Sequence, residues 1–208
     1  MDKTIWRRVK EMVRGFLPFY LFTLLLLSCS TETETEDEYA NWQERNDAAL
    51  SQWAANSSLR KIKTYTKDQT TAGQNSDYIY VEVLETGSGT ESPIYSDTCR
   101  LAYRGRLIPT TTYTDGYVFE ETYIGDFDWR TCAVVDFPLD YMLRDGFVTA
   151  LQNMHVGDRW RIHFSYTLGY GDTNMGAIPA YSDLIFDLAL VDFWHPGETR
   201  PTFRAREK

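Results

Sequence analysis

The stretch from Trp160 to Val191 constrains the fold most, because it holds two apolar strand patterns separated by a glycine-rich loop. In residues 159–164, apolar side chains alternate with two arginines and a histidine, which is the period-2 pattern of a half-buried strand. A second alternation of apolar residues runs from Leu184 to Leu190. We predict that the two segments pair in one sheet, and that the loop between them presents Tyr170 and Ile178 at the rim of a pocket.

The remaining segments indicate one helix among several short strands. Strand-like runs begin near residue 77 and cover Thr98–Ile108 and Val134–Leu139. Between Phe147 and Met154, the apolar residues fall at positions i, i+3, i+4 and i+7, which is typical of a helix with one buried face. These elements predict an α+β fold in which a bent antiparallel sheet wraps around one short helix.

A series of short segments between residues 97 and 193 also forms an ordered set. In chain order they are Tyr103–Leu107, Gly116–Glu120, Gly146–Phe147, Leu151–Asp158, Tyr170–Gly171, Ile178–Pro179 and Leu184–Leu188. This set resembles the motifs of the FKBP-type peptidyl-prolyl cis-trans isomerases. The resemblance implies the FKBP-like fold, a bent sheet around a short helix, and isomerase activity without a cofactor or a metal.

The resemblance also implies which side chains form the proline-binding pocket. The residues at positions that are catalytic in the family are Tyr103, Phe119, Glu120, Tyr170 and Phe186. The residues at its substrate-binding positions are Phe137, Leu143, Arg144, Phe147 and Ile178. Two of them depart from the usual pattern. Glu120 stands where the family usually has aspartate, and Arg144 replaces an aliphatic residue whose backbone N–H binds the substrate.

The chemistry of the chain agrees with a non-covalent reaction. We find no motif that pairs a nucleophile with a base, no zinc-protease motif and no phosphate-binding loop. Rotation of an X–Pro bond needs only relief of a resonance barrier of about 20 kcal/mol. An apolar pocket favours the twisted, less polar amide over the planar one. This chemistry agrees with the isomerase activity that the resemblance implies, on proline-containing polypeptides, and the resemblance also implies macrolide inhibitors as further ligands.

Two other functions remain open. The first is an FKBP-like peptide-binding or chaperone module with little or no isomerase activity, in which Glu120 and Arg144 reshape the pocket. The second is a glycan-binding surface formed by aromatic residues of the segment between Pro109 and Phe137, which contains Tyr113, Tyr123 and Trp129.

The N-terminus has the features of a secretory signal. Basic residues precede an apolar run from Phe16 to Leu27, which is shorter than the ~20 residues of a membrane-spanning helix. The sequence Leu26–Cys29 resembles the lipobox of bacterial lipoproteins, in which the cysteine is acylated. The alternative is a generic signal peptide with an incidental cysteine. We predict a signal peptide at residues 1–28, lipidation at Cys29, and anchoring to the outer membrane of the cell envelope, on its periplasmic face or at the cell surface.

The predicted domains follow from these patterns. Residues 30–38 are polar and acidic, which indicates a solvated tether and resembles the surface-export signal of lipoproteins in Bacteroidota. Between Glu38 and Ser57, apolar residues at helical spacing indicate an amphipathic helix that docks on its own domain. We therefore expect a tether with this helix at residues 29–76, an isomerase domain at 77–195 and a tail at 196–208.

Charge and cysteine content exclude other classes. The net charge of −9 disfavours a nucleic-acid partner, because phosphate contacts need a basic surface. Cys99 and Cys132 either form a disulfide or stay free and buried. They are not in a Cys-x-x-Cys spacing, and no histidine lies near either one in sequence, so we predict no metal site.

Overall fold

The computed structural model describes residues 37–140 and 144–202. Within them a compact unit begins at Glu38. The predicted signal peptide, the lipidation site Cys29 and the pocket residue Leu143 lie outside the described residues. Among the residues that are described, no helix combines the length and the apolar character needed to cross a bilayer.

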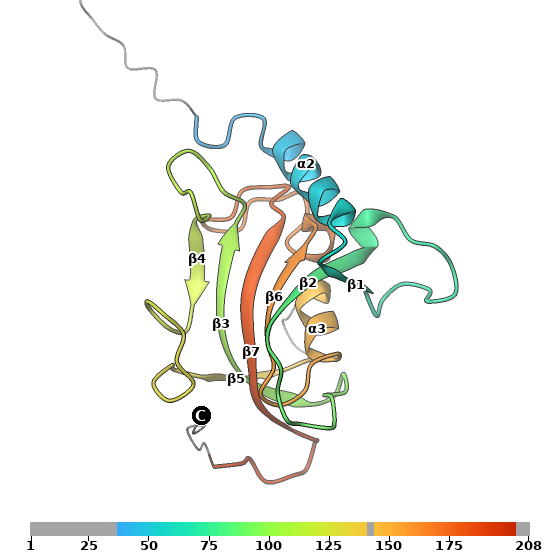
Figure 1. Ribbon diagram of the computed structural model, residues 1–208, viewed down its shortest axis with the longest axis vertical. Coiled ribbons are helices and arrows are strands. Elements are labelled where there is room, and N and C mark those ends of the chain that lie inside the picture. The colour runs from blue at the N-terminus through green and yellow to red at the C-terminus, as the bar shows by residue number, and fades with distance from the viewer. Residues whose placement is uncertain (1–36, 141–143, 203–208) are drawn as a thin grey trace, which may run out of the picture. The chain divides into compact units, whose positions relative to one another are not determined.

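One antiparallel sheet of seven strands organises the described chain (Figure 1). Its strand order is β1-β2-β6-β7-β3-β4, and β5 pairs with β3 off this path. The strands are β1 (Arg60–Lys63), β2 (Tyr78–Glu85), β3 (Thr98–Leu107), β4 (Val118–Glu121), β5 (Val135–Pro138), β6 (Arg159–Phe164) and β7 (Leu184–Trp194). The helices are α2 (Trp42–Ala55) and α3 (Asp145–Leu151), with 3-10 turns η1 (Asn75–Asp77) and η2 (Tyr166–Leu168).

The two strands that the alternating pattern predicts do pair, which confirms that prediction. Strands β6 and β7 are antiparallel neighbours, and Ile162 lies opposite Phe186. Because side chains alternate along both strands, this register places Ile162, Phe186 and Leu188 in the same buried cluster. The central strand β7 is buried from Leu184 to Leu190, since it is covered on both faces.

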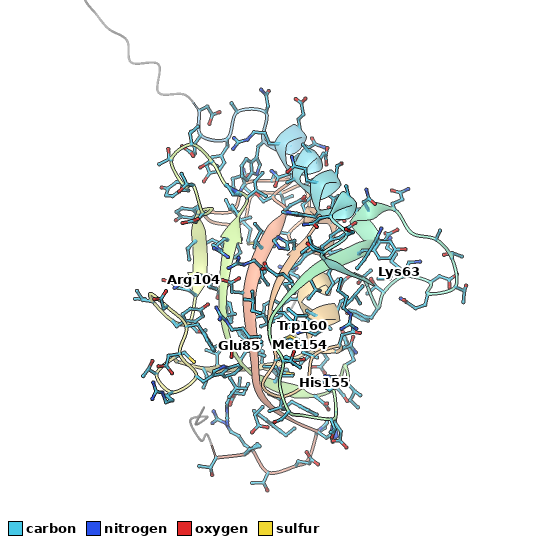
Figure 2. The ribbon with its side chains drawn as sticks, in the orientation of Figure 1. Lys63, Glu85, Arg104, Met154, His155 and Trp160 are labelled. Atoms are coloured by element: carbon cyan, nitrogen blue, oxygen red, sulfur yellow. The ribbon has the colours of Figure 1, made fainter. Side chains whose placement is uncertain are left out.

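Helix α3 packs against this buried face, and the predicted α+β fold is confirmed. The helix begins at Asp145 and ends at Leu151, so it starts earlier and ends earlier than the apolar spacing predicts. Met154, in the turn that follows, is fully buried in the same cluster as Trp160, and both residues are labelled in Figure 2. Gly146 allows the helix to approach the sheet, because a Cβ atom there would lie 2.5 Å from Cγ of Phe164.

The other face of the sheet carries ion pairs and a second apolar cluster. The Arg161 guanidinium contacts the Asp187 carboxylate at 2.6 Å. Beside this pair, Tyr123 and Trp129 are buried together with Cys132. Burial of Tyr123 and Trp129 contradicts a glycan-binding surface built on them, because their rings cover the sheet instead of facing solvent.

The structure also separates the two cysteines that could have formed a disulfide. Cys99 and Cys132 are both free and buried. Cys99 lies in the cluster beneath α3, and Cys132 lies in the second cluster. Burial raises the pKa of both thiols, which keeps them protonated and unreactive.

Helix α2 belongs to the same compact unit as the sheet. The indole N–H of Trp42 donates to Oγ of Ser182 at 2.8 Å, and the Asn46 side-chain oxygen accepts from the backbone N–H of Asp183 at 2.8 Å. Strand β1 adds to the edge of the sheet by pairing with β2. The helix therefore docks on its own domain as predicted, but the predicted division at residue 77 falls inside one compact unit.

Candidate active site

A cavity of about 310 Å³ lies where strands β3, β4, β5 and β7 meet the start of α3. Its walls are aromatic apart from one acidic, one basic and one thioether side chain. The lining residues are Tyr103, Glu120, Phe137, Arg144, Phe147, Tyr170, Met175 and Phe186. All of them except Met175 are among the pocket residues predicted from the sequence.

Phe186 lies at the centre of the aromatic wall. Its ring makes edge contacts with Phe147 at 5.1 Å and with Phe119 at 5.5 Å between ring centroids, and it stacks on Phe164 at 5.9 Å. The Tyr103 ring lies 6.2 Å away. These edge-to-face and stacked arrangements are the favoured aromatic geometries, so the rings support one another and keep the wall rigid.

The two polar groups on the β3 and β4 side of the cavity are joined by a hydrogen bond. The Tyr103 hydroxyl donates to Oε1 of Glu120 at 2.7 Å. Burial and this bond to a carboxylate raise the pKa of Tyr103 well above its ordinary value. The phenol therefore stays protonated, and Glu120 fixes its orientation although the glutamate side chain itself is largely exposed.

Arg144 enters the wall of the cavity from the residue that precedes α3. Its guanidinium carbon lies 4.5 Å from the centroid of the Tyr170 ring. This is the distance of a cation–π contact, so the arginine is held against the aromatic ring. The side chain therefore neither turns away from the cavity nor fills it.

Two predicted residues lie just behind the cavity wall. Phe119 packs on Phe186, and Gly105 of β3 makes room for both rings, because a Cβ atom at Gly105 would lie 2.6 Å from each of them. Ile178 is buried in the main cluster, where it supports the loop that follows β6. Neither is among the residues that line the cavity, and Phe119 touches that lining through its contact with Phe186.

Met175 lines the cavity and is missing from the sequence-based prediction. Its backbone exchanges two hydrogen bonds with Ile178, at 2.9 and 3.0 Å, which holds the tip of the loop in place. The side chain is 48% exposed, so it forms a flexible apolar rim. No periodic pattern covers an irregular loop, and the sequence therefore contained no signal for this residue beyond its place between Tyr170 and Ile178.

The described side chains support binding of an apolar group. Within residues 37–140 and 144–202, no cluster of three histidine, cysteine or acidic side chains could hold a metal ion. The cavity instead offers aromatic faces, one phenol fixed by a carboxylate, and a guanidinium at its wall. This arrangement suits a small apolar ring attached to a polar amide.

Comparison with known proteins identifies the domain. Residues 89–191 match the family model described as FKBP-type peptidyl-prolyl cis-trans isomerase. The chain is 29% identical to the macrophage infectivity potentiator of Trypanosoma cruzi, across 88% of this chain and 86% of that protein. It is 28% identical to the FKBP-type 22 kDa peptidyl-prolyl cis-trans isomerase of Escherichia coli, across 72% of this chain and 67% of that protein.

Solved structures share the fold. The crystal structure of FkpA from Escherichia coli superimposes with a TM-score of 0.56 at 21% identity, covering 93% of this chain and 73% of that one. A peptidyl-prolyl cis-trans isomerase from Pseudomonas syringae gives a TM-score of 0.54 at 20% identity, covering 76% of this chain and 98% of that one. Through residues 89–191, this chain belongs to the family of FKBP-type peptidyl-prolyl cis-trans isomerases.

Proposed function

We propose that the chain catalyses cis-trans isomerisation of X–Pro bonds in polypeptides, and that it does so in the aromatic cavity. The observation that carries the proposal is the cavity itself, which encloses about 310 Å³ between aromatic side chains of an FKBP-type domain. A proline ring fits an aromatic pocket by shape and apolar contact. Clients that emerge unfolded from a secretion pathway present such prolines.

The geometry supports a non-covalent mechanism. The rings of Phe147 and Phe186 surround the proline and exclude water, which favours the twisted amide because its dipole is smaller than that of the planar amide. Tyr170 lines the cavity from the loop that follows β6, and its hydroxyl can donate to a substrate carbonyl and hold the peptide. The backbone N–H of Arg144 is a second donor near the start of α3. The chain's residues thus bind and orient the peptide, and no bond is broken.

An isomerisation assay tests this proposal. Purified full-length protein is expected to accelerate cis-to-trans conversion in a short peptide of the Ala-Leu-Pro type. Tyr170→Phe is expected to lower kcat/KM by roughly threefold to tenfold, the effect of one lost hydrogen bond. Tyr123→Phe removes the same group from a buried tyrosine of the second cluster and serves as the matched control. A folded protein that leaves the conversion rate unchanged contradicts the proposal.

A second function is favoured by the contact between Arg144 and Tyr170. The guanidinium occupies a wall of the cavity next to the tyrosine that would hold the substrate carbonyl. A pocket narrowed in this way can bind a proline-containing peptide, or a macrolide such as rapamycin, without turning it over. Ligand binding measured by calorimetry, together with an unchanged conversion rate, would favour this binding or chaperone module over the isomerase.

We further propose that the protein is lipid-anchored in the cell envelope. The proposal rests on the sequence Leu26–Cys29, which resembles a lipobox. In a bacterial host with an outer membrane, the full chain is expected to incorporate labelled palmitate and to fractionate with membranes. Cys29→Ala is expected to remove the label, because the lipobox then lacks the cysteine that is acylated. Label that persists in this variant contradicts lipidation at Cys29.

A further inference from the structure

Arg144 gives the pocket wall a cation that is held in a defined place. The side chain lines the cavity, and its guanidinium carbon lies 4.5 Å from the centroid of the Tyr170 ring. A cation–π contact uses the face of the guanidinium and leaves the N–H groups at its edge available. Arg144 is also exposed, so a ligand can reach it.

The charge of Arg144 is not neutralised within the described chain. Arginines on the sheet are paired, as Arg104 is with Glu121 at 2.7 Å and Arg161 is with Asp187 at 2.6 Å. Among residues 37–140 and 144–202, no carboxylate oxygen lies within ion-pair distance of the Arg144 guanidinium.

The carboxylate that does line the cavity is engaged elsewhere. Glu120 accepts a hydrogen bond from the Tyr103 hydroxyl at 2.7 Å. Glu120 lies on β4, whereas Arg144 precedes α3. The pocket therefore has a carboxylate committed to an internal hydrogen bond and a guanidinium without an anionic partner in the described chain. A ligand bound there meets an open cation beside its apolar ring.

From this arrangement we propose that Arg144 is a specificity-determining residue, which makes the pocket select prolines flanked by an acidic residue. A planar guanidinium matches a carboxylate with two parallel N–H···O bonds, and the pair is stronger at the edge of an apolar cavity than in open solvent. The surface as a whole is acidic, with a net charge of −9, so the attraction is local to this pocket wall. The inference rests on the proposed function, since it names the substrate class of the same site.

The test compares peptides that differ only in charge beside the proline. Pairs of peptides carry Glu or Gln immediately before the proline, or immediately after it. Both the dissociation constant and kcat/KM are measured for each peptide with the full chain. The Glu peptide of at least one pair is expected to be favoured by roughly threefold or more, the size of a partly exposed ion pair. The preference is expected to shrink at 1 M salt, because salt screens exposed charges.

Variants assign the effect to one side chain. Arg144→Met is expected to remove the preference for Glu over Gln peptides, and Arg144→Glu is expected to reverse it, so that the Gln peptide is favoured. Arg130→Met is the matched control, because Arg130 is an exposed arginine paired with Asp128 outside the pocket lining. Only the ratio is compared, so a general loss of affinity in a variant does not affect the outcome.

The outcomes separate this inference from the proposed function. Equal binding and turnover of Glu and Gln peptides by the unchanged protein would overturn the inference, as would a preference that survives in Arg144→Met. Charge-dependent binding without turnover would support the inference and defeat the proposed isomerase.

Discussion

Phe186→Ala is expected to lower the free energy of unfolding by about 4 kcal/mol and to reduce kcat/KM by roughly tenfold or more. The ring is only 5% exposed and contacts Phe119, Phe147 and Phe164. Its removal therefore leaves a void in the main cluster and admits water to the wall of the aromatic cavity. Denaturant unfolding and a peptide isomerisation assay on the same preparation measure the two effects.

Phe127→Ala separates the loss of stability from the loss of the site. Phe127 also packs on two aromatic rings, those of Tyr123 and Trp129, but it belongs to the second cluster. The control variant is expected to lower stability while the activity of each folded molecule stays unchanged. If Phe186→Ala keeps the activity of the unchanged protein once it is shown to be folded, the aromatic cavity is not the site of isomerisation.

The free energy of unfolding is expected to depend on pH because of the buried carboxyl of Asp183, and Asp183→Asn is expected to remove this dependence. Asp183 is 1% exposed, and its Oδ1 accepts the backbone N–H of Tyr166 at 2.8 Å. Its Oδ2 has no hydrogen-bond partner among the residues that the structure describes. Burial raises the pKa of this carboxyl from 3.8 to about 7, and the nearby charge of Asp47 adds to the shift. The folded protein therefore holds this proton more tightly than the unfolded chain does.

The direction of the pH effect follows from that difference. Below about pH 4 the carboxyl is protonated in both states, so its ionisation does not yet lower the free energy of unfolding. Between about pH 4 and 7 the unfolded chain releases the proton and the folded protein keeps it, so the free energy of unfolding falls as pH rises. Above about pH 7 the carboxyl is ionised in both states, and the free energy of unfolding falls no further on its account. The total decrease is about 4 kcal/mol, because the pKa differs by about three units between the two states.

Unfolding at a series of pH values tests this expectation. Asn cannot ionise, so Asp183→Asn is expected to be more stable than the unchanged protein at pH 8. The gain is expected to be smaller than the full limit, because the amide nitrogen replaces an oxygen that has no partner and costs about 1–3 kcal/mol. Asp172→Asn, at an exposed position of the same loop, is the matched control. An unchanged pH profile in Asp183→Asn would show that this carboxyl does not titrate between pH 4 and 8.

The local sequence pattern was sufficient to predict the paired strands β6 and β7 and the presence of helix α3. The alternation around Ile162 and Phe186 specifies which side chains of β6 and β7 share a face, because a strand turns its side chains to opposite faces at every residue. The apolar spacing from Phe147 to Met154 likewise identifies residues of the main cluster, although the structure buries every residue from Gly146 to Leu151 and not one face alone. The exact ends of α3 differ from the prediction, since capping and the turn after Leu151 are decided by contacts with the sheet.

Most of the side chains that line the cavity were predicted from the resemblance of motifs and not from periodicity. Tyr103, Phe147 and Phe186 stand in motifs that keep their order along the chain, and the structure brings all three to one wall. Met175 could not be predicted, because it lies in an irregular loop whose backbone is set by its bonds to Ile178.

By itself, then, the sequence determined the strands and the short helix, because these depend on residues that are neighbours along the chain. The resemblance of its motifs to those of a known family indicated most of the pocket side chains. Only the tertiary structure decided that Arg144 lies against Tyr170, and that α2 docks on the loop before β7 through Asn46 and Asp183. These contacts join residues far apart in sequence. Their geometry depends on how the packed core positions both partners, and no local pattern records it.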